Sequence, residues 1–235
     1  MESRARQSIT RFLLALLFAC GGTFAAHRSA TAKEDLLKIN QAFPGPEDLQ
    51  YLPRYCWARM QVMGKRDVSD YDPVVYAEVQ EWRAMLGEGI FVHLHHYCGG
   101  LDRMRRYWLS VDMDGRQLDD IGRVTGGQRM TLEAALDEFR YVQGYMKNLK
   151  SILYQDMMVQ KAIAHWQLGE IEKAIKDLLT AINAKRDFDA PYLILSQIAE
   201  EQGNLKDAVD ILELGIKQVP GAASLRSRLD KLRGR

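Results

Sequence analysis

The chain has 235 residues, of which 47% are hydrophobic and 27% charged, and its 32 Lys and Arg nearly balance its 31 Asp and Glu. Together with a mean hydropathy of −0.28, this composition is that of a globular protein and excludes a disordered or fibrous chain. The balanced charge gives no general attraction to nucleic acid or to an anionic membrane, so neither is expected as a partner.

Residues 1–26 have the pattern of a bacterial export signal. Three arginines precede the apolar run Phe12–Ala19, and small residues follow it. The run is too short to span a membrane. Signal peptidase cleavage fits Thr23–Ala25 or Ala30–Ala32, whereas the sequence LFAC that ends at Cys20 resembles a lipobox. We therefore expect a periplasmic protein, with a lipid anchor at Cys20 as the alternative form of processing.

Residues 27–111 are predicted to form a helical N-terminal region. The sequence LPRYCWAR begins a short aromatic helix after Leu52. Asp72 and Pro73 begin a second helix, because aspartate caps helices and proline suits their first turn. The sequence Gly-Glu-Gly ends that helix, and a longer amphipathic helix is expected from Ile90 to about Val111.

Cys56 and Cys98 are the two cysteines that follow the export signal. In an oxidising compartment two such cysteines most often pair. The chain-entropy model gives roughly 4 kcal/mol of stabilisation for a closed loop of about 43 residues. Two buried apolar thiols are the alternative interpretation.

The sequence FVHLHHYCGGL contains three of the five histidines, His93, His95 and His96. Imidazole is the commonest protein ligand of zinc and copper, and Cys98 is nearby if it is reduced. On a helix, however, His93 and His96 share a face from which His95 points away, and no carboxylate has the His-Glu-x-x-His spacing. One interpretation is a metal site, and the other is an aromatic and polar packing layer around a disulfide.

Residues 112–130 are polar and contain glycines, so we predict a loop or insertion there. Their aspartates lack the spacing of an EF-hand, and their Gly-Gly pair lacks the Lys and Ser/Thr of a phosphate-binding loop. Thr131 is predicted to cap the next helix, which runs to about Leu149 within the segment 131–154. The core-facing residues of this helix follow at helical spacing and are Leu132, Leu136, Phe139, Val142 and Met146.

Residues 155–222 nearly repeat themselves with a period of 34. The glycine of the first unit, Gly169, recurs as Gly203, and small or apolar residues recur in the same way at Ala174 and Ala208 and at Leu178 and Leu212. The two glycines are predicted to end helices in the left-handed region. This unit resembles the tetratricopeptide repeat, a helix–turn–helix of the same length.

The resemblance implies an all-α fold, a right-handed α-solenoid of helix hairpins. The units are then 155–188 and 189–222, and 223–235 forms a capping helix with a polar outer face. The Cys98 helix and the helix within 131–154 would form a divergent first repeat. The sequences LPRYCWAR and FVHLHHYCGGL also resemble the N-terminal region of exported bacterial tetratricopeptide proteins, which supports a helical extension linked by the Cys56–Cys98 disulfide.

In a stack of such repeats the first helices line a concave groove. By the repeat register, the predicted protein-binding residues are Asp156, Val159, Ile163, Gln167, Leu193, Gln197 and Glu200. We expect a non-catalytic scaffold or adaptor of a cell-envelope assembly that binds a segment of another exported protein and needs no cofactor. The alternative is a metal-handling or redox-linked subunit that uses His93, His95 and His96. An enzyme of envelope metabolism is a third class, but the sequence singles out no catalytic residues.

Overall fold

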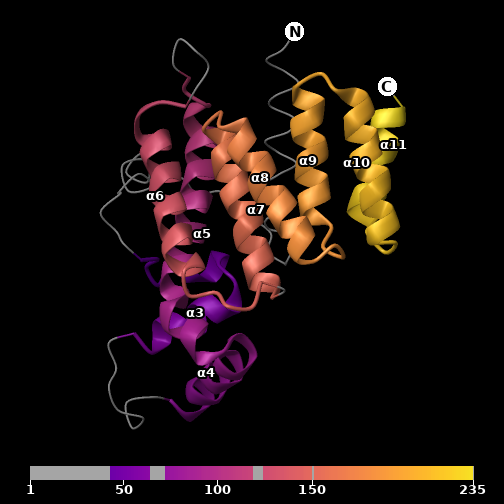
Figure 1. Ribbon diagram of the computed structural model, residues 1–235. Coiled ribbons are helices and arrows are strands. Elements are labelled where there is room, and N and C mark those ends of the chain that lie inside the picture. Colours follow the sequence, from indigo (N-terminus) through magenta and orange to yellow (C-terminus); the bar gives the residue numbers. More distant parts are fainter. Residues whose placement is uncertain (1–42, 64–71, 119–123, 150, 235) are drawn as a thin grey trace.

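The computed structural model describes residues 43–63, 72–118, 124–149 and 151–234 (Figure 1). Within these ranges the secondary structure is helical, apart from an isolated antiparallel bridge between Leu118 and Val124. The predicted all-α class is therefore confirmed. The export signal and Cys20 lie outside the described residues. None of the described helices combines the length and the apolar character needed to cross a bilayer.

The chain forms a short N-terminal group of helices followed by a stack of helix hairpins. In chain order the helices are η1 (Leu49–Tyr51), α3 (Arg54–Gln61), α4 (Pro73–Leu86), α5 (Glu88–Asp114), α6 (Gly126–Gln143), α7 (Ile152–Gln167), α8 (Ile171–Ala184), α9 (Ala190–Glu201), α10 (Leu205–Gln218) and α11 (Ala223–Arg233).

Three hairpins, α5–α6, α7–α8 and α9–α10, stack side by side and end in α11 (Figure 1). The two helices of each hairpin pack most extensively on one another. The second helix of each hairpin then packs on the helix that follows it, and successive first helices touch more lightly. The same contacts thus recur along the stack, in which α5 and α6 form the hairpin that precedes α7.

Small or well-fitted residues let the helices of a hairpin approach closely. A Cβ atom added at Gly100 of α5 would lie 2.4 Å from a ring carbon of Phe139 on α6. One added at Gly215 of α10 would lie 2.8 Å from Tyr192 on α9. Buried residues follow the same spacing in all three second helices, namely Ala135, Phe139 and Val142, then Ala174, Leu178 and Ala181, then Ala208, Leu212 and Gly215.

Some of the predicted helix boundaries agree with the structure and others do not. Asp72 caps α4 by accepting hydrogen bonds from the backbone N–H groups of Val74 and Val75, as predicted. The prediction that Thr131 caps α6 was wrong, because the helix begins at Gly126. The Thr131 hydroxyl instead donates to the Gly127 carbonyl oxygen within the helix at 2.7 Å.

The turns of the second and third hairpins use the predicted glycines. Gly169 has a φ of 79° and Gly203 a φ of 80°, which places both in the left-handed region that favours glycine. Both therefore end the first helix of their hairpin as the repeat pattern predicts.

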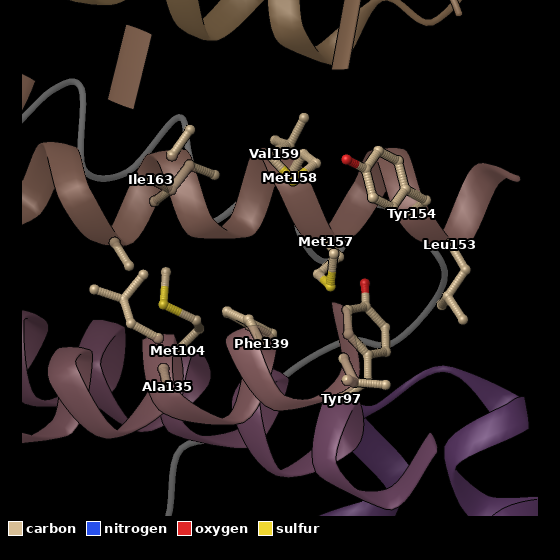
Figure 2. Packing of buried hydrophobic residues seen from close by; sticks show 14 of the residues in the cluster. Tyr97, Met104, Ala135, Phe139, Leu153, Tyr154, Met157, Met158, Val159 and Ile163 are labelled. Atoms are coloured by element: carbon tan, nitrogen blue, oxygen red, sulfur yellow. The ribbon is translucent and has the colours of Figure 1, made fainter. Parts of the chain in front are cut away.

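The main hydrophobic core lies where α7 packs on α5 and α6. Met157 of α7 points toward Tyr97 of α5 and Phe139 of α6 (Figure 2), and all three side chains are buried. A second, smaller cluster includes Tyr192 of α9, Leu212 of α10 and Leu225 of α11. Burial of apolar surface therefore holds consecutive hairpins together along the stack.

The predicted disulfide between Cys56 and Cys98 is present and ties α3 to α5. Both cysteines are fully buried. Confirmation of this pair means that neither thiol is available as a metal ligand.

A cluster of four charged side chains holds the segment before α3 on α5. Asp102 Oδ2 accepts from Arg106 Nε at 2.6 Å, and Asp102 Oδ1 accepts from Arg105 Nη2 at 2.8 Å. Asp48 also pairs with Arg105, and its Oδ2 lies 2.9 Å from Arg106 Nη2. The four side chains are at most 12% exposed, so this cluster fixes the position of the segment that begins at Phe43.

Candidate functional site

The predicted groove residues lie on α7 and α9, the first helices of the second and third hairpins. Their side chains are not open to solvent as the prediction implied. Asp156 and Glu200 are half-buried, and the remaining five are at most 7% exposed, namely Val159, Ile163, Gln167, Leu193 and Gln197.

Three of the predicted groove residues contact neighbouring helices. The Tyr97 hydroxyl of α5 donates to the Asp156 carboxylate. The Tyr107 hydroxyl, also of α5, donates to Gln167 Oε1 at 3.0 Å. Glu200 forms an ion pair with Arg228 of α11. These polar groups serve contacts between helices, which the repeat register alone did not indicate.

Burial changes the acid–base chemistry beside Asp156. Burial raises the pKa of Asp156 above its ordinary value, although hydrogen bonds from Tyr97 and Gln160 act in the opposite direction. Burial and the nearby Asp156 also raise the pKa of Tyr97 and of Tyr55. The phenols therefore stay protonated and act as donors, and the site has the character of a buried hydrogen-bond network.

The four other residues form what we call the α7–α9 face: Val159, Ile163, Leu193 and Gln197. Val159 and Ile163 point away from α5 and α6 (Figure 2). Leu193 and Gln197 occupy the equivalent places one repeat later. The face therefore consists of three apolar side chains and one amide.

Gln197 is the unusual member of this face. It is 1% exposed, yet neither its Oε1 nor its Nε2 has a hydrogen-bond partner among the described residues. Leaving a buried polar group unpaired costs about 1–3 kcal/mol. An amide offers one acceptor and two donor hydrogens, which is the complement of a peptide group with its own N–H and C=O. Gln197 thus has the donors and the acceptor that a polypeptide backbone needs, and it lies on the same face as three apolar side chains.

The three histidines of α5 lie in an aromatic layer with Tyr141 of α6 and with Tyr145, which follows the end of α6. His93 stacks on Tyr145 with ring centroids 3.5 Å apart, and the rings of His96 and Tyr141 are 3.9 Å apart. Tyr141 and Tyr145 are each 42% exposed, so the layer reaches the surface.

Each imidazole has its own polar neighbour. His96 Nδ1 lies 2.7 Å from Glu138 Oε2, and Arg59 Nη2 lies 3.3 Å from His95 Nδ1. Burial, with the Arg59 charge, lowers the pKa of His95 to about 4. His93 Nδ1 lies 3.2 Å from the Tyr141 hydroxyl.

These contacts correct the metal interpretation. Among the described residues, no group of three or more His, Cys, Asp and Glu side chains is arranged to hold a metal ion. His93, His95 and His96 meet three different partners, and Cys98 is part of the disulfide. The alternative interpretation, an aromatic and polar packing layer next to the disulfide, fits this geometry.

The hairpin α7–α8 also matches a known family. Residues 155–188 match the family model for the tetratricopeptide repeat. The resemblance drawn from the 34-residue period is therefore confirmed for this unit. A search of curated proteins found none that matches the chain.

Proposed function

Because the chain carries a tetratricopeptide repeat, a unit that typically serves protein–protein interaction, we propose that it is a non-catalytic scaffold that binds a partner protein on the α7–α9 face. The observation that carries this proposal is the buried, unpaired amide of Gln197. A bound polypeptide segment satisfies that amide and covers the apolar residues around it.

The chemistry of the face selects the kind of segment. An extended chain has free backbone N–H and C=O groups, whereas those in a helix interior are already paired. Gln197 therefore favours a segment that is extended where it crosses α9. Val159, Ile163 and Leu193 favour apolar side chains on either side of that crossing. The face has no charged member, so the interaction depends little on salt.

We place this scaffold in the periplasm, within a cell-envelope assembly. The arginines and apolar run of residues 1–26 support export, and the Cys56–Cys98 disulfide fits an oxidising compartment. The partner is then another exported or envelope protein.

The test is a crosslinking pull-down from intact cells that express the full chain. Gln197→Leu keeps the volume of the side chain and removes its amide, so the fold is retained while backbone pairing is lost. We expect the partner to be captured at least about tenfold less well, which corresponds to about 1.4 kcal/mol. Leu214→Gln is the matched control, because Leu214 is 50% exposed on α10.

The two variants together decide the proposal. A partner that the wild type and Leu214→Gln capture equally, and that Gln197→Leu loses, supports binding on the α7–α9 face. Equal capture by all three proteins refutes it. Unfolding of purified Gln197→Leu, followed by circular dichroism, checks that the variant is at least as stable as the wild type.

A further inference from the structure

A carboxylate without a cationic partner lies beside the α7–α9 face. Asp156 of α7 accepts hydrogen bonds from Gln160 and from the hydroxyl of Tyr97, whose ring points from α5 toward α7 (Figure 2). In the part of the chain that the structure describes, no Lys, Arg or His side chain pairs with this carboxylate or offsets its charge. The buried Asp102, by contrast, pairs with two arginines. Asp156 is half-buried, so a cation from outside the chain can reach it.

Gln160 places a second acceptor next to this carboxylate. Its side chain is 4% exposed and forms a hydrogen bond with Asp156. Its Oε1 has no hydrogen-bond partner among the residues with described positions. A carboxylate and an amide oxygen, one turn apart on α7, therefore lie close together without a charged donor. Because an unpaired buried acceptor is unfavourable, this arrangement favours a ligand that brings N–H donors.

The chemistry of the two acceptors selects an ammonium group. Burial raises the pKa of the Asp156 carboxyl, because its ionised form is poorly solvated, and a bound cation stabilises that ionised form. An ammonium has three N–H donors and no acceptor. The planar fork of a guanidinium suits the two oxygens of one carboxylate, but Oδ2 of Asp156 already accepts from Tyr97. The compact ammonium of lysine is therefore the better fit to acceptors on two different side chains.

We propose that Asp156 and Gln160 Oε1 bind the ammonium group of a lysine in the partner segment that crosses the α7–α9 face. This inference rests on the proposed function and names one residue type of the partner. Asp156 and Ile163 are seven residues apart on α7, which places the carboxylate on the same side of the helix as the face. Salt screens a half-buried ion pair less than an exposed one, so the interaction still depends little on salt.

The distance between Asp156 and Gln197 sets the spacing within the segment. Gln197 occupies the place of Ile163 one repeat later, and Ile163 lies two helical turns, about 10 Å, from Asp156. Neighbouring helix axes are about 8–10 Å apart. The direct path is therefore about 14 Å, which an extended chain covers in about four residues. The lysine thus lies about four residues from the one that pairs with Gln197.

The test uses the purified full chain and three synthetic peptides. Each peptide consists of Val and Thr, which favour an extended chain, is blocked at both ends, and has Lys, Arg or norleucine at its centre with four residues on either side. Norleucine keeps the carbon chain of lysine without the ammonium. Fluorescence anisotropy of the labelled peptides measures each Kd. We expect the Lys peptide to bind at least about tenfold more tightly than the norleucine peptide, and more tightly than the Arg peptide.

Asp156→Asn then assigns the preference for lysine to this carboxylate. Asparagine keeps an acceptor for the Tyr97 hydroxyl and removes the charge, so we expect a folded protein, checked by urea denaturation, that has lost the preference. Asp137→Asn, at a carboxylate that is 68% exposed on α6, is the matched control and keeps it.

Four results overturn the proposal. They are equal binding of the Lys and norleucine peptides, binding of the Arg peptide as tight as that of the Lys peptide, a preference for lysine that persists in Asp156→Asn, and no binding of the Lys peptide at millimolar concentration.

Gln197→Leu separates this inference from the proposed function. If it weakens the Lys and norleucine peptides alike and the wild type shows no preference for lysine, the lysine site fails alone. If the preference depends on Asp156 but Gln197→Leu changes neither affinity, the pairing of Gln197 with a backbone fails and the lysine site stands. If both are correct, each of the two substitutions weakens binding of the Lys peptide.

Discussion

Replacing Asp102 by alanine tests whether the buried charge cluster holds the N-terminal segment on α5. Asp102 is 4% exposed and pairs with both Arg105 and Arg106, which are 9% and 8% exposed. Its removal leaves two buried guanidinium groups with Asp48 as the remaining carboxylate of the cluster. Removing one partner from a buried ion pair typically costs about 3–5 kcal/mol, because the remaining charge is not solvated. We expect a loss of that size in the free energy of unfolding.

Urea denaturation of the purified, oxidised protein measures this loss, and a second variant makes the measurement specific. Asp137→Ala changes the same residue type on a helix and breaks an ion pair with Arg140, but Asp137 is 68% exposed. Exposed pairs contribute about 0–1 kcal/mol, so this control is expected to stay within that range. The difference in helix propensity is the same in both variants. Equal losses for Asp102→Ala and Asp137→Ala would refute the reasoning.

Two further predictions concern packing and pH. Gly100→Ala places a Cβ atom 2.4 Å from Phe139 and is expected to lower the free energy of unfolding by about 1–3 kcal/mol, measured by thermal unfolding. Gly89 has open space around it, so Gly89→Ala is expected to be neutral or stabilising. A Gly100→Ala protein as stable as Gly89→Ala would contradict the close approach. Because burial raises the pKa of Asp156 above its ordinary 3.8, stability is highest below that value and falls as the carboxyl ionises at higher pH. Asp156→Asn is expected to remove this fall from a urea-denaturation series measured upward from pH 3.8. An identical fall in both proteins would exclude Asp156 as its cause.

The sequence alone was sufficient to predict the features that depend on residues close together in the chain. The period of 34 residues predicted the hairpins α7–α8 and α9–α10, because each turn needs a glycine and each close contact needs a small residue at a fixed place. The Asp72 cap followed from local chemistry in the same way. The Cys56–Cys98 pair required one further argument, from the number of cysteines and the expected compartment.

The first hairpin was predicted with less accurate boundaries. The spacing of Ala135, Phe139 and Val142 is the same as in the later repeats, and this signal was present in the sequence. The start of α6 could not be predicted from the sequence. It depends on Gln128, which ties the preceding loop to the helix by accepting from Gln117 N and donating to the Gly115 carbonyl oxygen. Such contacts between a side chain and a loop leave no periodic pattern.

The candidate site shows what the sequence could not decide. The repeat register correctly placed the predicted groove residues on first helices, since a helical period fixes the side on which a residue lies. It did not reveal that Tyr97 of α5 reaches Asp156 or that Arg228 of α11 reaches Glu200. It equally did not reveal the burial of Gln197.

The histidine cluster also shows the difference between what the sequence and what the tertiary structure determine. Three imidazoles within four positions suggested a metal site, and nothing in the sequence named their neighbours. Glu138 of α6 and Tyr145, which follows the end of α6, lie far along the chain and contact His96 and His93 in the folded protein. Periodicity determines which side of a helix a residue occupies, because it depends on the geometry of one helix. What covers that side depends on how distant helices pack, and only the tertiary structure decides it.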